Sequence, residues 1–534
     1  MNDHYDHIIV GGGSAGCVAA WRLVKEKSAR VLMLERGPAR ASGLSRYLLA
    51  MPAAWMMGIR GNAVVEMHEP VPQKQLNGRK PLVGQANILG GGTSVNAMVY
   101  TRGQREDYDH WDKFLGGKSG WCFADMLKHF TTMECNHSFN DTFHGVGGPL
   151  HVSDTGSKCQ ITEDYILAVQ GLGVPFNPDF NGARQRGVGT MQYTTWNKRR
   201  WNGVEAFLSV IMSDPLFSVK ADCTVARLIV ENGRCVGVAF VEAGRVTEVR
   251  CESVLMAAGT YNTPKILMLS GIGPADHLKQ HGIVTKVDLP GVGENLQDHH
   301  EVPVVAATNG HFGYYGEDCG FRALVNGLQY TFFKTGPVTS NGVEACAYID
   351  PMGGDRPTIK MYCVPSVYLD ADVKNVAPQD GVTLNACLLR PKSRGTVRLR
   401  SANALDKPIV DNNYLAEPDD LHMEIAGLRY AREILKQAPL SMRISHEMLP
   451  GRDVIDDAGL AEHCRRSVKT NWHPVGTCRM GPEGDTSAVL DSQLRVRGLD
   501  GLRVIDASAM PFIPSGNTNA PTMAVASRAV EFLS

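Results

Sequence analysis

The sequence His7-Ile8-Ile9-Val10-Gly11-Gly12-Gly13-Ser14-Ala15-Gly16 decides how the first part of the chain folds. Its four leading apolar residues predict a short buried strand at 7–10, and a helix is expected from 17 to about 27. A second strand is expected at 30–35, which ends in Glu35. This strand–helix–strand unit contains the pattern GxGxxG, which is typical of a dinucleotide-binding domain.

Each glycine of this pattern has its own physical role. Gly11 permits the tight turn, Gly13 lets a pyrophosphate approach the backbone, and Gly16 lets the helix pack closely on the strand. The first amide groups of the helix then face the phosphates. The carboxylate of Glu35 can accept hydrogen bonds from ribose hydroxyls and would repel a 2′-phosphate, so NADP is disfavoured.

Two other interpretations of these glycines remain open. The segment could be a structural turn without a ligand. It also matches GxSxG, the nucleophile elbow of serine hydrolases, with Ser14 as nucleophile. An elbow normally follows several strands of the sheet and would leave Glu35 without a role, so the dinucleotide interpretation is favoured.

Composition excludes several classes of protein. The 534 residues carry 54 Lys and Arg against 55 Asp and Glu, which argues against a general nucleic-acid binder. A hydrophobic content of 43% argues against a disordered chain. The 13 cysteines show no CxxC spacing, so we expect neither a zinc site nor a disulfide framework. Reduced thiols and the lack of a basic, apolar leader after Met1 predict a cytoplasmic enzyme.

A membrane contact is expected to be peripheral at most. The longest apolar stretch, 47–59, is interrupted by Pro52 and is too short to span a bilayer. We expect it to pack in the core or to cover a pocket entrance.

Five further blocks follow the first one in a fixed order. They are Leu89–Asn96, Gly259–Gly273, Leu289–His299, Trp472–Gly481 and Gly516–Met523. Together with residues 11–16 they resemble the glucose–methanol–choline (GMC) oxidoreductase family, and the resemblance extends from residue 5 to the C-terminus. It is strongest to the bacterial choline, sorbose and alcohol dehydrogenase branch.

The resemblance implies an α/β fold with a Rossmann-like FAD-binding domain and a discontinuous α+β substrate-binding domain. Strand and turn signals support this, with a meander at 225–230, 236–242 and 246–255, a strand at 503–506 and a closing helix at 520–533. The predicted division assigns 1–155, 200–310 and 465–534 to the FAD-binding domain. The substrate-binding domain is then 156–199 and 311–464.

The resemblance also implies which residues bind the cofactor. They are Gly11, Gly13, Ser14, Ala15, Gly16, Glu35, Thr93, Asn96, Ala97, Met98, Val99, Val225, Trp472, Asp506, Ala507, Asn519 and Thr522. Some family members attach the flavin through a histidine just before the asparagine. Val95 occupies that position here and has no nucleophile, so non-covalent FAD is expected.

The catalytic pair implied by the resemblance is His473 and Asn517. A histidine titrates near neutrality and can accept the proton of an alcohol, while flavin N5 takes the hydride. Asn517 can hydrogen-bond the same oxygen and fix the substrate near N5. A non-catalytic flavoprotein is disfavoured because both residues are present.

The expected reaction is oxidation of a small primary alcohol to the aldehyde. The alternative is an oxidase that acts on a hydroxymethyl group on a ring or on a sugar-like polyol. The sequence does not decide whether the electron acceptor is oxygen or an acceptor such as a quinone.

The block at 298–300 is expected to be a structural loop. His137, His144 and His151 recur every seven residues without a supporting carboxylate pattern, so no metal site is expected. The sequence does not predict an oligomeric state.

Overall fold

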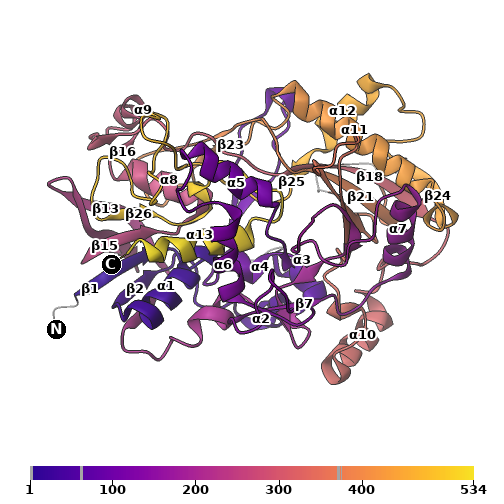
Figure 1. The fold of residues 1–534 in the computed structure, drawn as a ribbon, viewed down its shortest axis with the longest axis horizontal. Helices are drawn as coiled ribbons and strands as arrows, with labels where there is room; N and C mark the ends of the chain where they lie inside the picture. Colours follow the sequence, from indigo (N-terminus) through magenta and orange to yellow (C-terminus); the bar gives the residue numbers. More distant parts are fainter. Residues whose placement is uncertain (1–3, 60–63, 370–372, 374–375, 534) are drawn as a thin grey trace.

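The computed structural model describes residues 4–59, 64–369, 373 and 376–533. Two large sheets lie side by side along the long axis of the molecule (Figure 1). The first is built around the N-terminal βαβ unit, and both ends of the chain lie in this half. Within the described ranges, no helix is long and apolar enough to cross a bilayer.

The first sheet has a parallel part with the strand order β12-β2-β1-β15-β26. Its strands are β1 (Tyr5–Val10), β2 (Val31–Leu34), β12 (Phe217–Lys220), β15 (Arg245–Met256) and β26 (Leu502–Val504). Helix α1 (Ser14–Lys27) joins β1 to β2, and the C-terminal helix α13 (Asn519–Glu531) packs against it. The predicted strands and helices of this region are therefore confirmed, with ends that differ by a few residues.

The long strand β15 belongs to two layers. Its first half pairs with β14 (Arg234–Glu242), which pairs with β13 (Cys223–Glu231), and this antiparallel meander matches the predicted one. Its second half lies between β1 and β26 in the parallel part.

The second sheet is antiparallel, with the order β24-β18-β21-β20-β19-β8 and β25 paired to β18. Its strands are β8 (Gly187–Thr190), β18 (His300–Thr308), β19 (Ala345–Ile349), β20 (Ile359–Val364), β21 (Gly381–Leu388), β24 (Ile444–Leu449) and β25 (Lys469–Thr470). The helices that pack on one face are α7 (Gln160–Gly171), α11 (Pro418–Leu435) and α12 (Asp457–Ser467).

Strand β20 shows how this sheet separates its two faces. Alternate side chains of a strand point to opposite faces. Ile359, Met361 and Cys363 are buried in the core beneath the helices, whereas Lys360 and Tyr362 line a cavity on the other face. The second sheet thus presents polar side chains toward the first half of the molecule.

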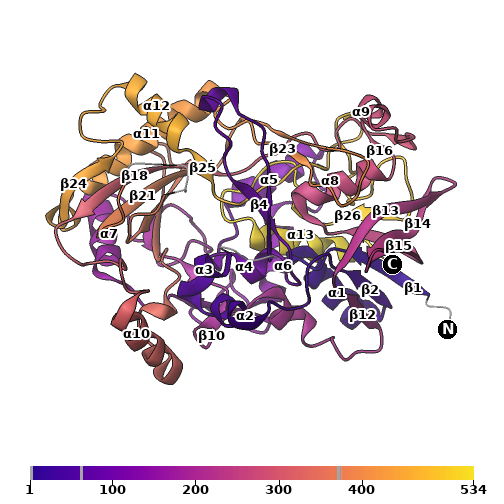
Figure 2. The ribbon, with the colours of Figure 1, turned by 180° about the vertical axis from the view of Figure 1, so that it is seen from behind.

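A two-stranded ribbon crosses the junction between the halves, as Figure 2 shows. It consists of β3 (Val65–His68) and β4 (Val83–Ala86). Between these strands the chain reaches α12, where Arg79 donates a hydrogen bond to the carbonyl oxygen of Arg465. The ribbon therefore connects both halves along one side of the cavity.

The remaining helices and strands are shorter or lie outside the two large sheets. The helices are α2 (Gly43–Ala50), α3 (Trp55–Ile59), α4 (Gly92–Val95), α5 (Arg105–Phe114), α6 (Phe123–Met133), α8 (Gly259–Leu269), α9 (Ala275–Gln280) and α10 (Gly320–Phe333). The strands are β5 (Val99–Tyr100), β6 (Glu134–Asn136), β7 (Leu150–Asp154), β9 (Gln192–Tyr193), β10 (Thr195–Trp196), β11 (Arg199–Arg200), β16 (Ile272–Gly273), β17 (Val287–Asp288), β22 (Thr396–Arg398) and β23 (Ile409–Asp411).

The chain passes repeatedly between the halves. Strands β18 and β25 lie in the second sheet, although both fall entirely in stretches that the sequence assigned to the FAD-binding domain. The division into two domains stays a prediction.

Gly16→Ala should destabilise the first turn, because an added Cβ would lie 2.0 Å from the carbonyl oxygen of Gly11. Gly11 itself has φ of 106° and cannot easily move. Overpacking of this kind costs about 1–3 kcal/mol, so we expect a lower midpoint of thermal unfolding by circular dichroism. The control is Gly147→Ala, whose Cβ would meet nothing within 4 Å. Equal midpoints for the two variants would contradict the packing argument.

Candidate active site

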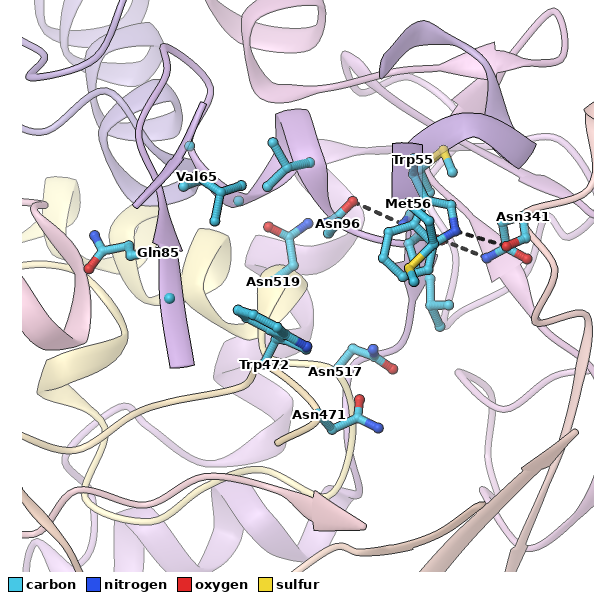
Figure 3. Close-up of a pocket in the computed structure, with 18 of the residues that line it drawn as sticks. Trp55, Met56, Val65, Gln85, Asn96, Asn341, Asn471, Trp472, Asn517 and Asn519 are labelled. Carbon is cyan, nitrogen blue, oxygen red and sulfur yellow. Dashed lines mark hydrogen bonds between the residues drawn. The ribbon is translucent and has the colours of Figure 1, made fainter. Parts of the chain in front are cut away.

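A large cavity lies between the two halves and has a volume of about 1090 Å³. Ligand pockets usually measure about 300–1,000 Å³, so this cavity has room for more than one small molecule. Its wall runs from the turn after β1 to the polar face of the second sheet. In Figure 3, Trp472, Asn517 and Asn519 lie across this space from Trp55 and Met56.

The predicted cofactor residues converge on this cavity, although they come from distant parts of the chain. The lining includes Gly11, Gly13, Ser14, Ala15, Glu35, Asn96, Ala97, Met98, Val99, Val225, Trp472, Asp506, Ala507, Asn519 and Thr522. Gly16 and Thr93 lie behind the wall instead. Gly16 packs within the first turn, and the Thr93 hydroxyl donates to Gly90 and accepts from the Gly203 amide. Both support the shape of the site without lining it.

Glu35 holds the first turn together. One oxygen of its buried carboxylate accepts from the Gly12 amide at 2.8 Å, and the other accepts from the Gly37 amide at 2.7 Å. Burial raises the pKa of this carboxyl, and the amides of Gly37 and Gly12 oppose the rise. Because Glu35 also lines the cavity, its remaining lone pairs can accept hydrogen bonds from a ligand.

Ser14 is not placed as a hydrolytic nucleophile. Its hydroxyl donates a hydrogen bond of 2.7 Å to the side-chain oxygen of Asn519. An amide oxygen cannot act as the general base that such a serine requires. The GxSxG interpretation therefore fails on the geometry of the site.

The second glycine-rich loop meets the first turn backbone to backbone. A Cβ on Gly91 would lie 2.5 Å from the Cα of Gly13. Buried Arg200 holds this loop by donating to the carbonyl oxygens of Thr93 and Asn96 and to the side chain of Asn96. Sequence reasoning missed Arg200, since no motif marks it.

His473 sits in a turn that a buried carboxylate anchors. Asp298 accepts from the backbone amide of His473 at 2.9 Å and from the hydroxyl of Thr470 at 2.6 Å. Burial raises the pKa of Asp298 to about 6. Trp472, beside the histidine, adopts a left-handed backbone with φ of 64°. Such strained residues persist where their surroundings over-determine them, and they cluster at functional sites.

Four side chains form one hydrogen-bonded row, the reaction-end chain of Lys360, Asn517, His473 and His299. Lys360 lies 2.9 Å from the Asn517 side-chain oxygen, and the Asn517 amide nitrogen lies 2.9 Å from His473 Nε2. His473 Nδ1 lies 3.0 Å from His299 Nδ1. His299 Nε2 lies 3.0 Å from the carbonyl oxygen of Leu389.

The partners fix the protonation of the reaction-end chain. A lysine can only donate, so the oxygen of Asn517 faces Lys360 and its NH₂ group donates to His473 Nε2. The carbonyl of Leu389 can only accept, so His299 carries its proton on Nε2 and accepts at Nδ1. His473 must then carry its proton on Nδ1, which leaves a lone pair on Nε2 at the cavity.

Electrostatics keep both histidines neutral. Burial, the neighbouring His299 and the ammonium of Lys360 hold the pKa of His473 well below its usual range. Burial likewise lowers the pKa of His299 to about 3. His473 can therefore accept a proton at neutral pH. Sequence reasoning treated 298–300 as a structural loop and missed that His299 contacts His473.

The histidines spaced by seven residues do not gather as one group. His137 and His151 are hydrogen-bonded at 2.8 Å and lie close to Cys135, whereas His144 contacts Asp179 and Glu134. The described part of the chain offers three ligand atoms in the first group. A structural zinc site takes four, so we base no function on it.

Comparison with known proteins identifies the family. Two family models, both described as GMC oxidoreductase, match residues 5–301 and 391–526. The chain belongs to the GMC oxidoreductase family. The resemblance found in the sequence is thereby confirmed.

Individual relatives cover almost the whole chain. The chain is 38% identical to an alcohol dehydrogenase (acceptor) of Pseudomonas putida, over 99% of this chain and 95% of the relative. It is 37% identical to an oxygen-dependent choline dehydrogenase of Sinorhizobium fredii, with the same coverage. Among solved structures, a pyridoxine 4-oxidase from Mesorbium loti superposes with a TM-score of 0.89 at 28% identity, covering 99% of this chain and 98% of the other.

Enzymes of this family bind FAD and act on CH–OH donors, so the chain is an FAD-dependent oxidoreductase. The residues present fit that cofactor. The N-terminus of α1 has no side-chain cap, and Ser14 and Ala15 of its first turn line the cavity. Free amide groups at such a helix end suit a pyrophosphate, and Glu35 lies at the same end of the site for the ribose.

Glu35→Ala should weaken FAD binding much more than it slows turnover at saturating FAD. A hydrogen bond to a charged group contributes about 1.5–3 kcal/mol, which corresponds to a rise of about 10–100-fold in the dissociation constant. Titration of the apoprotein with FAD, followed by flavin fluorescence, measures this constant. Glu26→Ala is the control, because it removes a carboxylate from the far end of α1, where it pairs with Arg22. Activity that excess FAD cannot restore would contradict the role of Glu35.

Proposed function

We propose that the protein oxidises a small primary alcohol to the aldehyde, with His473 as the proton acceptor. The observation that carries this proposal is the neutral His473, whose Nε2 lone pair meets Asn517 at the edge of the cavity. The match to an alcohol dehydrogenase along the whole chain supports the same reaction.

Each residue of the reaction-end chain has one task. His473 takes the hydroxyl proton on Nε2, and the imidazolium that forms keeps its Nδ1–H on His299. Asn517 donates to the substrate oxygen and so orients the carbinol carbon. FAD, when bound, supplies the hydride acceptor at flavin N5. The buried surroundings of His473 exclude water and strengthen these hydrogen bonds.

A second candidate is an oxidase that acts on a hydroxymethyl group on a ring or on a sugar-like polyol. The similarity to a pyridoxine 4-oxidase favours it. The electron acceptor is accordingly oxygen or an acceptor such as a quinone. A panel of alcohols, run once with oxygen and once with an artificial acceptor, separates the two candidates. Secondary alcohols that react far faster than primary ones would contradict both.

We infer that the enzyme works in the cytoplasm with at most peripheral membrane contact. All thirteen cysteines have free thiols in the structure, which suits a reducing compartment. The stretch around Pro52 supports the second inference, because Leu48, Met51, Trp55 and Met56 line the cavity.

His473→Ala should retain FAD and lose about 10²–10⁴-fold in the rate of flavin reduction, because a positioned general base contributes that much. Asn517→Ala should lose less, on the order of 10²-fold, since it removes one hydrogen-bond donor. Anaerobic stopped-flow reduction measures both rates after the flavin spectrum of each variant has been checked. The control is His446→Ala, an exposed histidine on β24. Near wild-type reduction by His473→Ala would refute the assignment.

The flavin should be released into the supernatant when the protein is precipitated with acid. Val95 lines the cavity where a tethering histidine would be needed, and it has no nucleophilic atom. Absorbance of the supernatant and of the pellet measures the partition. Flavin that stays with the washed pellet would establish a covalent bond and overturn this expectation.

A further inference from the structure

The reacting end of the cavity carries two buried charges on one face of the second sheet. Glu301 of β18 and Lys360 of β20 both line the cavity, and their side chains are almost fully buried. Both residues are register partners of Cys387 on the intervening strand β21. Two strand spacings of about 4.8 Å therefore separate their backbones.

The negative charge of Glu301 is compensated within the protein. Lys469 approaches one carboxylate oxygen at 3.3 Å, and the hydroxyl of Tyr362 donates to the same oxygen. The side-chain amide of Asn471 donates to the other oxygen. A cationic ligand would have to compete with these three donors for Glu301.

The positive charge of Lys360 has no such compensation. Its ammonium donates to the neutral amide of Asn517, and no carboxylate pairs with it among the residues that the structure describes. The cavity is also lined by Glu317, which pairs with Arg322, and by the exposed Asp318. A buried ammonium without an anionic partner is costly, and it persists here beside the catalytic pair.

We propose that Lys360 makes this pocket select alcohols by charge, so that it rejects cationic alcohols and accepts neutral or anionic ones. This inference rests on the proposed function and names its substrate class. Two like charges about 6 Å apart at an effective dielectric constant of about 20 repel enough to lower affinity about 10²-fold. The carboxylate nearest to hand gives a cationic group little compensation, because Glu301 is already paired with Lys469.

Three primary alcohols that differ only in the terminal group test the proposal. Choline carries a trimethylammonium group, 3,3-dimethylbutan-1-ol is its neutral isostere, and 3-hydroxypropanoate carries a carboxylate. The holoenzyme is assayed with each for kcat/KM and, anaerobically, for the dissociation constant from the change in the flavin spectrum. We expect choline to be about 10²-fold poorer than its neutral isostere in both quantities, and 3-hydroxypropanoate to be at least as good as the isostere.

Variants at Lys360 locate the effect. Lys360→Met should lower turnover of every alcohol, because Asn517 loses its partner, but it should raise the ratio of choline to the neutral isostere about 10–100-fold. Lys360→Arg keeps the positive charge and should keep the wild-type ratio of choline to the neutral isostere. This variant can be measured even if Lys360→Met fails to fold. Lys334→Met removes an exposed lysine at the end of α10 and should leave the ratio unchanged.

The pH profile gives a second readout that a structural defect would not move. The groups around His473 are Asn517, His299, Lys360 and, through the backbone amide, Asp298. His473 accepts a proton only when neutral, so kcat/KM falls as pH drops through its pKa. Loss of the Lys360 charge raises that pKa, and the acid limb of Lys360→Met should move to higher pH.

The outcomes separate this inference from the proposed function. Charge selection would be overturned if choline and its isostere had equal kcat/KM and equal dissociation constants, or if neither of them bound. It would also be overturned if Lys360→Met left the ratio of choline to the isostere unchanged. Absence of flavin reduction by every alcohol in the broader panel would instead overturn the proposed function. Charge selection and the proposed function are both supported if the ratios are as expected and the acid limb of Lys360→Met moves to higher pH.

Discussion

The chemistry of this site depends on one polar constraint, which is that an ammonium group can donate hydrogen bonds but cannot accept them. Lys360 thereby sets the orientation of Asn517, and the carbonyl of Leu389 sets the tautomer of His299 from the other side. His473 lies between these fixed ends and has one protonation state open to it. The lone pair that the reaction requires is thus set by residues on four separate segments of the chain.

The two halves contribute different kinds of interaction. The first half offers mainly backbone at the cavity, where Gly13 and Gly91 approach each other and the uncapped end of α1 is open. The second half offers side chains such as Lys360 and Tyr362, held on a regular sheet. Backbone suits a cofactor whose phosphates are always the same, while side chains can vary with the substrate. The β3–β4 ribbon keeps the two halves in register across the cavity.

The parts of the fold and of the site that could be predicted are those that depend on local sequence patterns. The turn at 11–16 and the meander ending in β15 depend on neighbouring residues, and both were found from the sequence. His473 and Asn517 were assigned through family resemblance, because a single histidine among 17 carries no local signal. Lys360, His299 and Arg200 were missed. Their roles arise from strand pairing and loop contacts across hundreds of residues, which no window of sequence contains.

The strand order of the parallel sheet determines how long one strand edge stays unpaired while the protein is synthesised on the ribosome. Strand β15 ends at Met256, whereas its neighbour β26 begins only at Leu502. At about 5–20 residues per second of synthesis, the edge of β15 stays open for roughly 12–50 s. An open apolar edge can pair with other chains, so this enzyme is exposed to misassembly until its last residues emerge. The strand order therefore leaves this edge unpaired through almost half of the synthesis of the chain.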